Sequence, residues 1–269
     1  MLLEGPDCKL WVKVSGDGAP VTVFAHGLTS SSADISDIGS RVGGTRVFFD
    51  FRGHGRSESP PERSGYGLDA MMRDFDYIAT TFGAHNALGV SLGASVITRL
   101  IARQPARFDR IVLVIPARLD GGEPAADEYL AMADALESRR AEDIAADVLL
   151  REAVANLIAR APVWKDRLRK QVMAMNATGT PRALRAAAGG PPPLSEATAL
   201  RSVAVPVLIA AHEGDPSHDA AVARRLADLL PAAELRVWPN VLEMLDDMAA
   251  FSEFIAAFLS RDPAVVVVP

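Results

Sequence analysis

One short segment limits the fold of this chain more than any other, the pentapeptide Gly-Val-Ser-Leu-Gly at residues 89–93. It joins residues 86–90, an apolar run typical of a buried strand, to residues 92–103, whose apolar side chains recur with the period of a helix. A serine at such a sharp turn adopts a strained backbone, and glycines two positions before and after it let the chain turn closely. We therefore expect Ser91 to project from the edge of a sheet, although a turn kept for packing alone would have the same sequence.

Apolar runs typical of strands alternate with amphipathic segments along most of the chain. The predicted strands are residues 9–14, 21–26, 45–50, 86–90, 111–115, 205–211 and 234–238, and the clearest predicted helices are 68–82, 92–103 and 251–258. This alternation is typical of a mostly parallel sheet with helices on both faces. The predicted fold class is therefore α/β.

Residues 119–200 have a different pattern, with no convincing strand and with Ala-, Leu- and Arg-rich helical periodicity. We predict a helical cap over 119–200, inserted into a core domain formed by 1–118 and 201–269. Five cap side chains are candidates for an apolar substrate pocket, or at least equally for the cap's own core because of their helical spacing: Trp164, Leu168, Val172, Met173 and Met175.

Composition excludes several classes of partner. The formal net charge of -6 provides no broad basic field for nucleic acid or anionic lipid, and no apolar run reaches the roughly 18 residues of a membrane span. Cys8 is the only cysteine, and the first residues lack the features of a signal peptide, so we expect a cytoplasmic protein. No metal-ligand cluster or dinucleotide fingerprint is found, so no metal or other cofactor is expected. The apolar run 264–268 packs on the surface or on a second chain, which leaves a homodimer open.

Two further segments carry a resemblance. Phe-Ala-His-Gly-Leu at 24–28 and Asp-Phe-Arg-Gly-His-Gly-Arg-Ser at 50–57 precede the pentapeptide, and together they resemble the α/β-hydrolase family, in particular its esterase- and lipase-like members with a helical cap. The resemblance covers nearly the whole chain and implies an eight-stranded, mostly parallel sheet. It also implies that Ser91 is a nucleophile and that the backbone N–H groups of Leu28 and Leu92 form an oxyanion hole.

The resemblance further implies a catalytic triad in the order serine, acid, histidine. Residues 207–216 resemble the segment that carries the acid and put Asp215 in its place, although an aspartate before a proline is also a common turn former. The family histidine lies after the last strand, but no histidine follows residues 234–238. Two alignments of this region put Val241 or Glu243 there instead. Valine cannot carry a proton, and a carboxylate with a pKa near ~4 is a poor base for a serine hydroxyl.

Five histidines occur elsewhere in the chain. His218 lies three residues after Asp215 and is a candidate for a relocated base, although it could equally be a polar residue at the start of a helix. The others have weaker claims to that role: His54 is usually structural in the family, His26 is expected to brace the oxyanion loop, His85 is expected at the opposite edge of the sheet, and His212 lies near the acid without an assigned role.

The missing histidine leaves three hypotheses for function, because removal of this residue from a serine protease triad costs about 10⁶ in turnover. The first is a hydrolase of a small apolar ester, thioester or lactone that uses Ser91 with a relocated base such as His218. The second is a non-hydrolytic enzyme that uses the oxyanion hole for elimination, decarboxylation or cyclisation. The third is a ligand-binding or regulatory protein that has kept the pocket and lost the chemistry.

Overall fold

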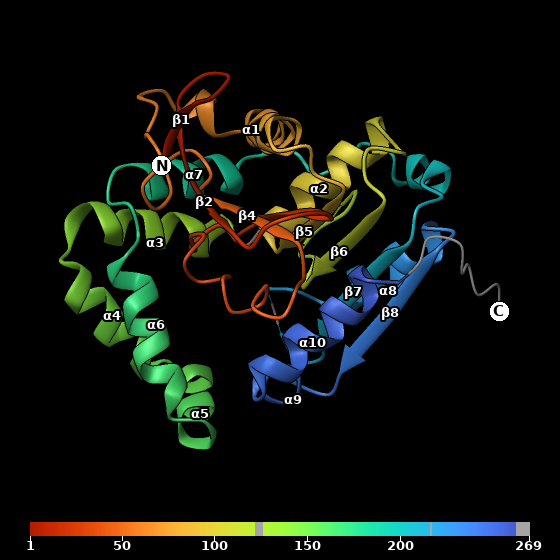
Figure 1. Cartoon of the computed structure of the whole chain (residues 1–269). Helices are drawn as coiled ribbons and strands as arrows, with labels where there is room; N and C mark the ends of the chain where they lie inside the picture. The colour runs from red at the N-terminus through yellow and green to blue at the C-terminus, as the bar shows by residue number, and fades with distance from the viewer. Residues whose placement is uncertain (122–125, 216, 262–269) are drawn as a thin grey trace.

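Eight strands form a single sheet in the order β1-β2-β4-β3-β5-β6-β7-β8 (Figure 1). The computed structural model describes residues 1–121, 126–215 and 217–261, so the apolar run 264–268 lies outside the described residues. The pairs β1–β2 and β2–β4 are antiparallel and the other five pairs are parallel. The strands are β1 Leu2–Glu4, β2 Lys9–Ser15, β3 Val21–Ala25, β4 Thr45–Phe49, β5 Asn86–Val90, β6 Arg110–Val114, β7 Val207–His212 and β8 Ala233–Trp238.

The predicted α/β fold is confirmed, and so are the seven predicted strands, within two residues at their ends. Strand β1 was not predicted, because three residues are too few to establish an alternating pattern. The short helix α9 (Val241–Leu245) was not predicted either, and it occupies the connection in which the family histidine was expected.

Helices cover both faces of the sheet (Figure 1). One face packs against α1 (Leu68–Thr81), α2 (Leu92–Arg103) and α8 (Ala220–Leu229), and the other packs against α10 (Met248–Leu259). Successive residues of a strand therefore enter opposite cores. In β3, for example, Val23 joins the first core and Phe24 the second. Among the described residues, no helix is both long enough and apolar enough to cross a lipid bilayer.

The segment between β6 and β7 is helical, and its described residues 119–121 and 126–200 contain no strand. Its α-helices are α3 Ala126–Ser138, α4 Ala141–Leu150, α5 Glu152–Arg160, α6 Val163–Met173 and α7 Gly179–Ala188. Helix α7 packs along α3, and α6 packs along α4. This segment corresponds to the predicted cap, and α7 returns the chain toward the core.

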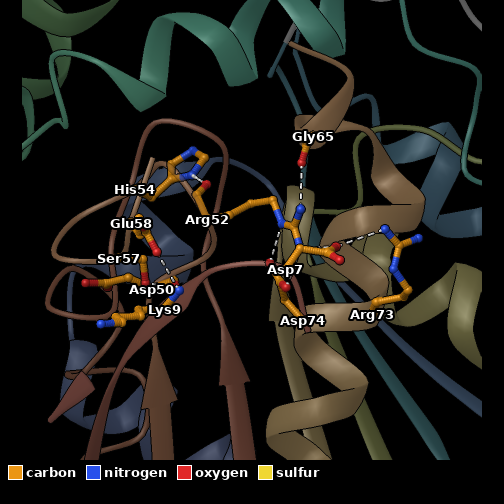
Figure 2. A network of polar contacts seen from close by, with 10 residues as sticks. All are labelled: Asp7, Lys9, Asp50, Arg52, His54, Ser57, Glu58, Gly65, Arg73 and Asp74. Atoms are coloured by element: carbon orange, nitrogen blue, oxygen red, sulfur yellow. Dashed lines mark hydrogen bonds and ion pairs between the residues drawn. The ribbon is translucent and has the colours of Figure 1, made fainter. Parts of the chain in front are cut away.

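A buried ion pair holds the loop that follows β4 (Figure 2). The Arg52 guanidinium donates two hydrogen bonds to the Asp74 carboxylate, at 2.7 Å from Nε and 2.6 Å from Nη2. The two side chains are 2% and 0% exposed. Arg52 also donates to Asp7 (3.0 Å) and to the carbonyl of Gly65 (2.9 Å). Residues 50–57 are thereby attached to α1 and to the chain between β1 and β2.

Removing one partner of this pair is expected to destabilise the protein strongly. Arg52→Leu leaves the Asp74 carboxylate buried without its main partner, and we expect a loss of about 3–5 kcal/mol in the free energy of unfolding, measured with urea. The exposed pair Arg139–Asp147 provides the control, because Arg139→Leu should cost less than about 1 kcal/mol. A loss for Arg52→Leu as small as that for Arg139→Leu would contradict this role.

Candidate active site

Ser91 lies in the sharp turn between β5 and α2, with backbone angles φ 52° and ψ −106°. The turn requires its flanking glycines. A Cβ on Gly89 would lie 2.4 Å from the carbonyl carbon of Gly93, and a Cβ on Gly93 would lie 2.3 Å from the carbonyl oxygen of Ala25. Serine often caps a helix, but the Ser91 hydroxyl makes no capping hydrogen bond to α2. It is thus available to a partner outside the helix.

The turn lies where the strand order reverses. Strands β3 and β5 are neighbours, while β4 and β6, which follow them in sequence, lie on opposite sides. Open parallel sheets bind ligands at the carboxyl ends of strands at such a point. The loop after β3 reaches this edge, because a Cβ on Gly27 would lie 3.6 Å from the Cβ of Ser91. The turn that carries Ser91 and the predicted oxyanion loop after β3 are therefore adjacent.

Two backbone N–H groups are candidates for stabilising an anion there. Leu28 and Leu92 line the same cavity as Ser91, and no acceptor within the described residues is hydrogen-bonded to either N–H. Leu92 is also the first residue of α2, so the positive end of the helix dipole points to this side of Ser91. The position and free donors are consistent with the predicted oxyanion hole.

Two buried histidines hold the loop after β3. His26 accepts a hydrogen bond from the Phe51 N–H at Nε2 (2.9 Å), so Nδ1 carries the proton and donates to the Gly27 carbonyl (2.7 Å). Burial lowers the pKa of His26 to about 3 and that of His54 below its usual value. The ring of His54 contacts the carbonyls of Arg52 and Leu28. Both rings are thus used to brace the loop, as expected for His26 and for a structural His54.

His218 joins Ser91 to Asp215. Its Nδ1 lies 2.7 Å from Oδ2 of Asp215, and its Nε2 lies 2.9 Å from Oγ of Ser91. Because an aspartate carboxylate only accepts, Nδ1 donates, and Nε2 accepts from the Ser91 hydroxyl. The structure therefore brings together the three residues that sequence reasoning had named, with the histidine and the acid in the same loop between β7 and α8.

The local contacts of this loop orient the acid. The Ser217 N–H donates to Oδ1 of Asp215 (2.9 Å), and the Asp219 side chain caps α8 by accepting from the Ala221 N–H (2.9 Å). Asp215 and His218 have side chains that are each 20% exposed. Burial raises the pKa of Asp215, but its bond to His218, the charge of His218 and the Ser217 N–H outweigh burial and bring this pKa to about 2. The acid is therefore ionised at every pH at which an imidazole is neutral.

A second imidazole flanks the same carboxylate. His212 is the last residue of β7, and its Nε2 lies 3.7 Å from Oδ2 of Asp215, while its Nδ1 contacts the Glu213 carbonyl at 3.0 Å. Its side chain is only 7% exposed. The charge of His212 also lowers the pKa of Asp215. The sequence had placed this residue near the acid without giving it a role.

The place where the family histidine was expected is taken by α9. The Asn240 side chain accepts from the Glu243 N–H (3.0 Å) and donates to the Glu243 carboxylate (2.9 Å), which closes the first turn of this helix. Glu243 is thereby engaged at the helix start, and Val241 is the first helical residue. Neither of the two residues from the alternative alignments contacts Ser91 among the hydrogen bonds of the described chain.

A cavity of about 100 Å³ opens beside Ser91. Trp164, Met173 and Met175 do not line it. Helix α6 packs instead on α4 and on the loop after β3, where Gln171 donates to the Thr29 carbonyl (3.1 Å). The cavity is lined by Leu28, Tyr66, Gly67, Leu68, Met71, Ser91, Leu92, Ser95, Ala117, Arg118, Tyr129, Ala183, Ala186, Ala187, Gly190, Pro191 and Pro193.

Sequence analysis missed most of the residues that line the cavity, and two segments show why. Helix α7 supplies small residues at helical spacing, Ala183, Ala186 and Ala187, a pattern that could have signalled a close approach to a ligand. The chain just after β6 supplies Ala117 and Arg118, for which no motif gave a signal. Among the described residues, no group of three or more His, Cys, Asp and Glu side chains is arranged to hold a metal ion.

Comparison with known proteins assigns the family. The model of the Alpha/beta hydrolase family matches residues 22–267, and the chain belongs to this family. Membership supports a hydrolase-type function. Among curated proteins, none matches the sequence.

Several solved structures share the fold. The enol-lactonase from Burkholderia xenovorans LB400 superposes with a TM-score of 0.81 at 20% identity, covering 97% of this chain and 100% of that one. A thermophilic esterase from Thermogutta terrifontis gives 0.75 at 19% identity, covering 94% and 93%. A structure from work on carboxylesterases of Nitrososphaera gargenis gives 0.81 at 16% identity, covering 96% and 99%. At these identities the likeness establishes the fold alone.

The low pKa of Asp215 predicts a specific dependence of stability on pH. The carboxyl is held at a pKa of about 2, against 3.8 for the ordinary group. Its stabilisation is therefore complete above pH 3.8 and is lost as the pH falls toward 2. Between these limits we expect wild type to lose up to about 2 kcal/mol more unfolding free energy than Asp215→Asn.

The measurement is urea unfolding at a series of pH values, with Asp228→Asn, an exposed aspartate on α8, as the control. The Asp228→Asn curve should follow that of wild type. Parallel curves for wild type and Asp215→Asn would contradict an Asp215 that is stabilised in its ionised form.

Proposed function

We propose that this protein hydrolyses a small ester, thioester or lactone, with Ser91 as nucleophile, His218 as general base and Asp215 as the group that orients His218. One observation carries the proposal, the continuous chain of hydrogen bonds from Asp215 through His218 to the Ser91 hydroxyl. A nucleophile, a base within hydrogen-bond reach and a third group that orients the base are the three parts that such catalysis requires.

In the proposed reaction, Nε2 of His218 takes the proton of Ser91 as Oγ attacks the substrate carbonyl. Asp215 stabilises the imidazolium that forms, and the N–H groups of Leu28 and Leu92 stabilise the negative oxygen of the tetrahedral intermediate. His218 then gives its proton to the leaving oxygen or sulfur, and an acyl group remains on Ser91. A water molecule, deprotonated by His218, attacks this acyl group and restores the hydroxyl. The chemistry requires no cofactor.

The size of the cavity supports a small substrate. About 100 Å³ is below the roughly 300–1,000 Å³ of pockets that hold drug-sized ligands, which favours a short acyl chain or a compact ring beside Ser91. Esters and lactones are also the substrate classes named for proteins that share this fold. A small, largely apolar molecule is therefore the proposed partner. A cytoplasmic location and a homodimer remain predictions from the sequence.

The hydrogen bond between His218 and Ser91 favours hydrolysis over the two alternatives. A non-hydrolytic enzyme and a binding protein were considered because the usual histidine is missing. An imidazole 2.9 Å from the serine hydroxyl offers a base for the hydrolytic route, and this supports our preference for hydrolysis.

Labelling with a fluorophosphonate probe, followed by intact mass, tests the proposal. Wild type should gain one adduct, Ser91→Ala none, and His218→Ala should react at least about 10³-fold more slowly, because the serine loses its base. His85→Ala is the matched control, since His85 lies at the other edge of the sheet and contacts the Val21 N–H (3.2 Å). Its labelling rate should equal that of wild type.

Two outcomes of this experiment count against the proposal. A folded wild type that gains no adduct would reject an activated Ser91. An adduct that forms equally fast in His218→Ala would reject His218 as the base while leaving Ser91 as the nucleophile.

A further inference from the structure

The cavity beside Ser91 contains one charged side chain. Among the lining residues within the described chain, Arg118 alone carries a formal charge. The other polar side chains there are hydroxyls, and the remaining walls are Leu, Met, Ala, Gly and Pro. A charge beside apolar walls interacts more strongly with an opposite charge than it would in water, because the surroundings screen it less. This cavity therefore differs from a purely hydrocarbon pocket.

A strained backbone residue lies three positions before Arg118. Strand β6 ends at Val114, and the next residue, Ile115, has φ 42°, a rare conformation for a β-branched side chain. Ser91 and Ile115 are the two non-glycine residues with positive φ in the described part of the chain. The Ile115 N–H donates to the Ala210 carbonyl (2.7 Å), which holds the strained residue against β7. Strain of this kind clusters at functional sites, and here it precedes the two residues that enter the cavity, Ala117 and Arg118.

A second hydrogen-bond donor comes from the cap. Tyr129 of α3 lines the same cavity and is half-buried. Burial raises the pKa of its phenol above the usual value, and the charge of Arg118 opposes part of that rise. Tyr129 therefore keeps its proton near neutral pH and can donate it. The core and the cap thus each contribute one donor to the lining of the same cavity.

We propose that Arg118 and Tyr129 form a carboxylate-binding subsite, so that the substrate is a short ester, thioester or lactone that carries a carboxylate. This inference rests on the proposed hydrolysis at Ser91 and narrows its substrate class. The planar guanidinium matches the two oxygens of a carboxylate, and the phenol adds a donor to one of them. The apolar side chains that line the rest of the cavity suit the few methylene groups that would join the scissile carbonyl to the carboxylate.

Matched pairs of substrates test the subsite. The methyl monoesters of succinate, glutarate and adipate are compared with the neutral methyl esters of butanoate, pentanoate and hexanoate, by release of methanol. At least one monoester should exceed its neutral partner in kcat/KM, and Arg118→Met should reduce that monoester's value by about 10- to 100-fold, as expected for hydrogen bonds to a charged group. The deciding quantity is the ratio of kcat/KM for the monoester to kcat/KM for its neutral partner, which Arg118→Met should lower by this factor.

The control for loss of positive charge is Arg139→Met, because Arg139 lies on the cap surface in a pair with Asp147. It should leave both substrate series unchanged. Tyr129→Phe should lower the same ratio of monoester to neutral ester, by less than Arg118→Met does. If Arg118→Met does not fold, competition against hydrolysis of methyl pentanoate by wild type decides instead: the subsite predicts that free glutarate inhibits at a lower concentration than pentanol, and equal or weaker inhibition by glutarate overturns it.

The outcomes separate this inference from the proposed function. Hydrolysis that depends on Ser91 but shows no preference for any monoester, or a preference that survives Arg118→Met, overturns the subsite and leaves the hydrolase. If no ester is hydrolysed, the proposed function fails. Calorimetry of Ser91→Ala with monomethyl glutarate then decides the subsite alone: binding that Arg118→Met removes supports it, and no binding overturns it.

Discussion

The turn at Ser91 is the constraint on which the rest of this structure depends. It holds a non-glycine residue at φ 52°, and it is accommodated because Gly89 and Gly93 allow a strand, a helix and the neighbouring strand β3 to meet at van der Waals distance. The same turn lies at the reversal of strand order, so that loops from both directions converge on it. The buried pair of Arg52 and Asp74 and the rings of His26 and His54 then hold the loops around it. These buried polar side chains near the carboxyl edge of the sheet thus hold the loops that surround the Ser91 hydroxyl.

The position of His218 changes how the site is assembled. The family resemblance implies that the acid and the histidine come from separate loops, which must each reach the serine. Here both lie in the loop between β7 and α8, three residues apart, so their mutual contact is local and only the contact of His218 with Ser91 joins distant parts of the chain. Fewer contacts between distant parts of the chain therefore have to form to bring the three side chains together. The connection after β8 is then free to form α9, capped by Asn240 and Glu243.

The fold could be predicted largely from the sequence because its signals are local. The apolar pattern of a single strand or helix, and the turn at Ser91, can each be recognised within some fifteen residues, and the order of these elements then indicates the fold. Asp215 could be placed because its segment resembles the family. The contact between His218 and Ser91 could only be offered as one candidate, since it depends on the path of a loop and spans 127 positions. The residues that line the pocket were the hardest to predict. Helix periodicity shows that apolar side chains such as Trp164, Met173 and Met175 are candidates for burial, but it does not say which neighbour they face. Arg118 lines the cavity three residues after the strained residue Ile115, and neither the strain nor this placement can be predicted from composition.

The proposed base, His218, has to carry its proton on Nδ1 and face the serine with a bare Nε2. Nitrogen NMR of protein labelled at histidine measures the position of this proton directly in the neutral form of the ring, with His218→Gln used to assign the signals. We expect Nδ1 of His218 to be protonated and Nε2 to be bare, and we expect Asp215→Asn to weaken or reverse this preference by removing the acceptor at 2.7 Å. A proton on Nε2 of His218 in wild type, with Nδ1 bare, would rule out His218 as the base.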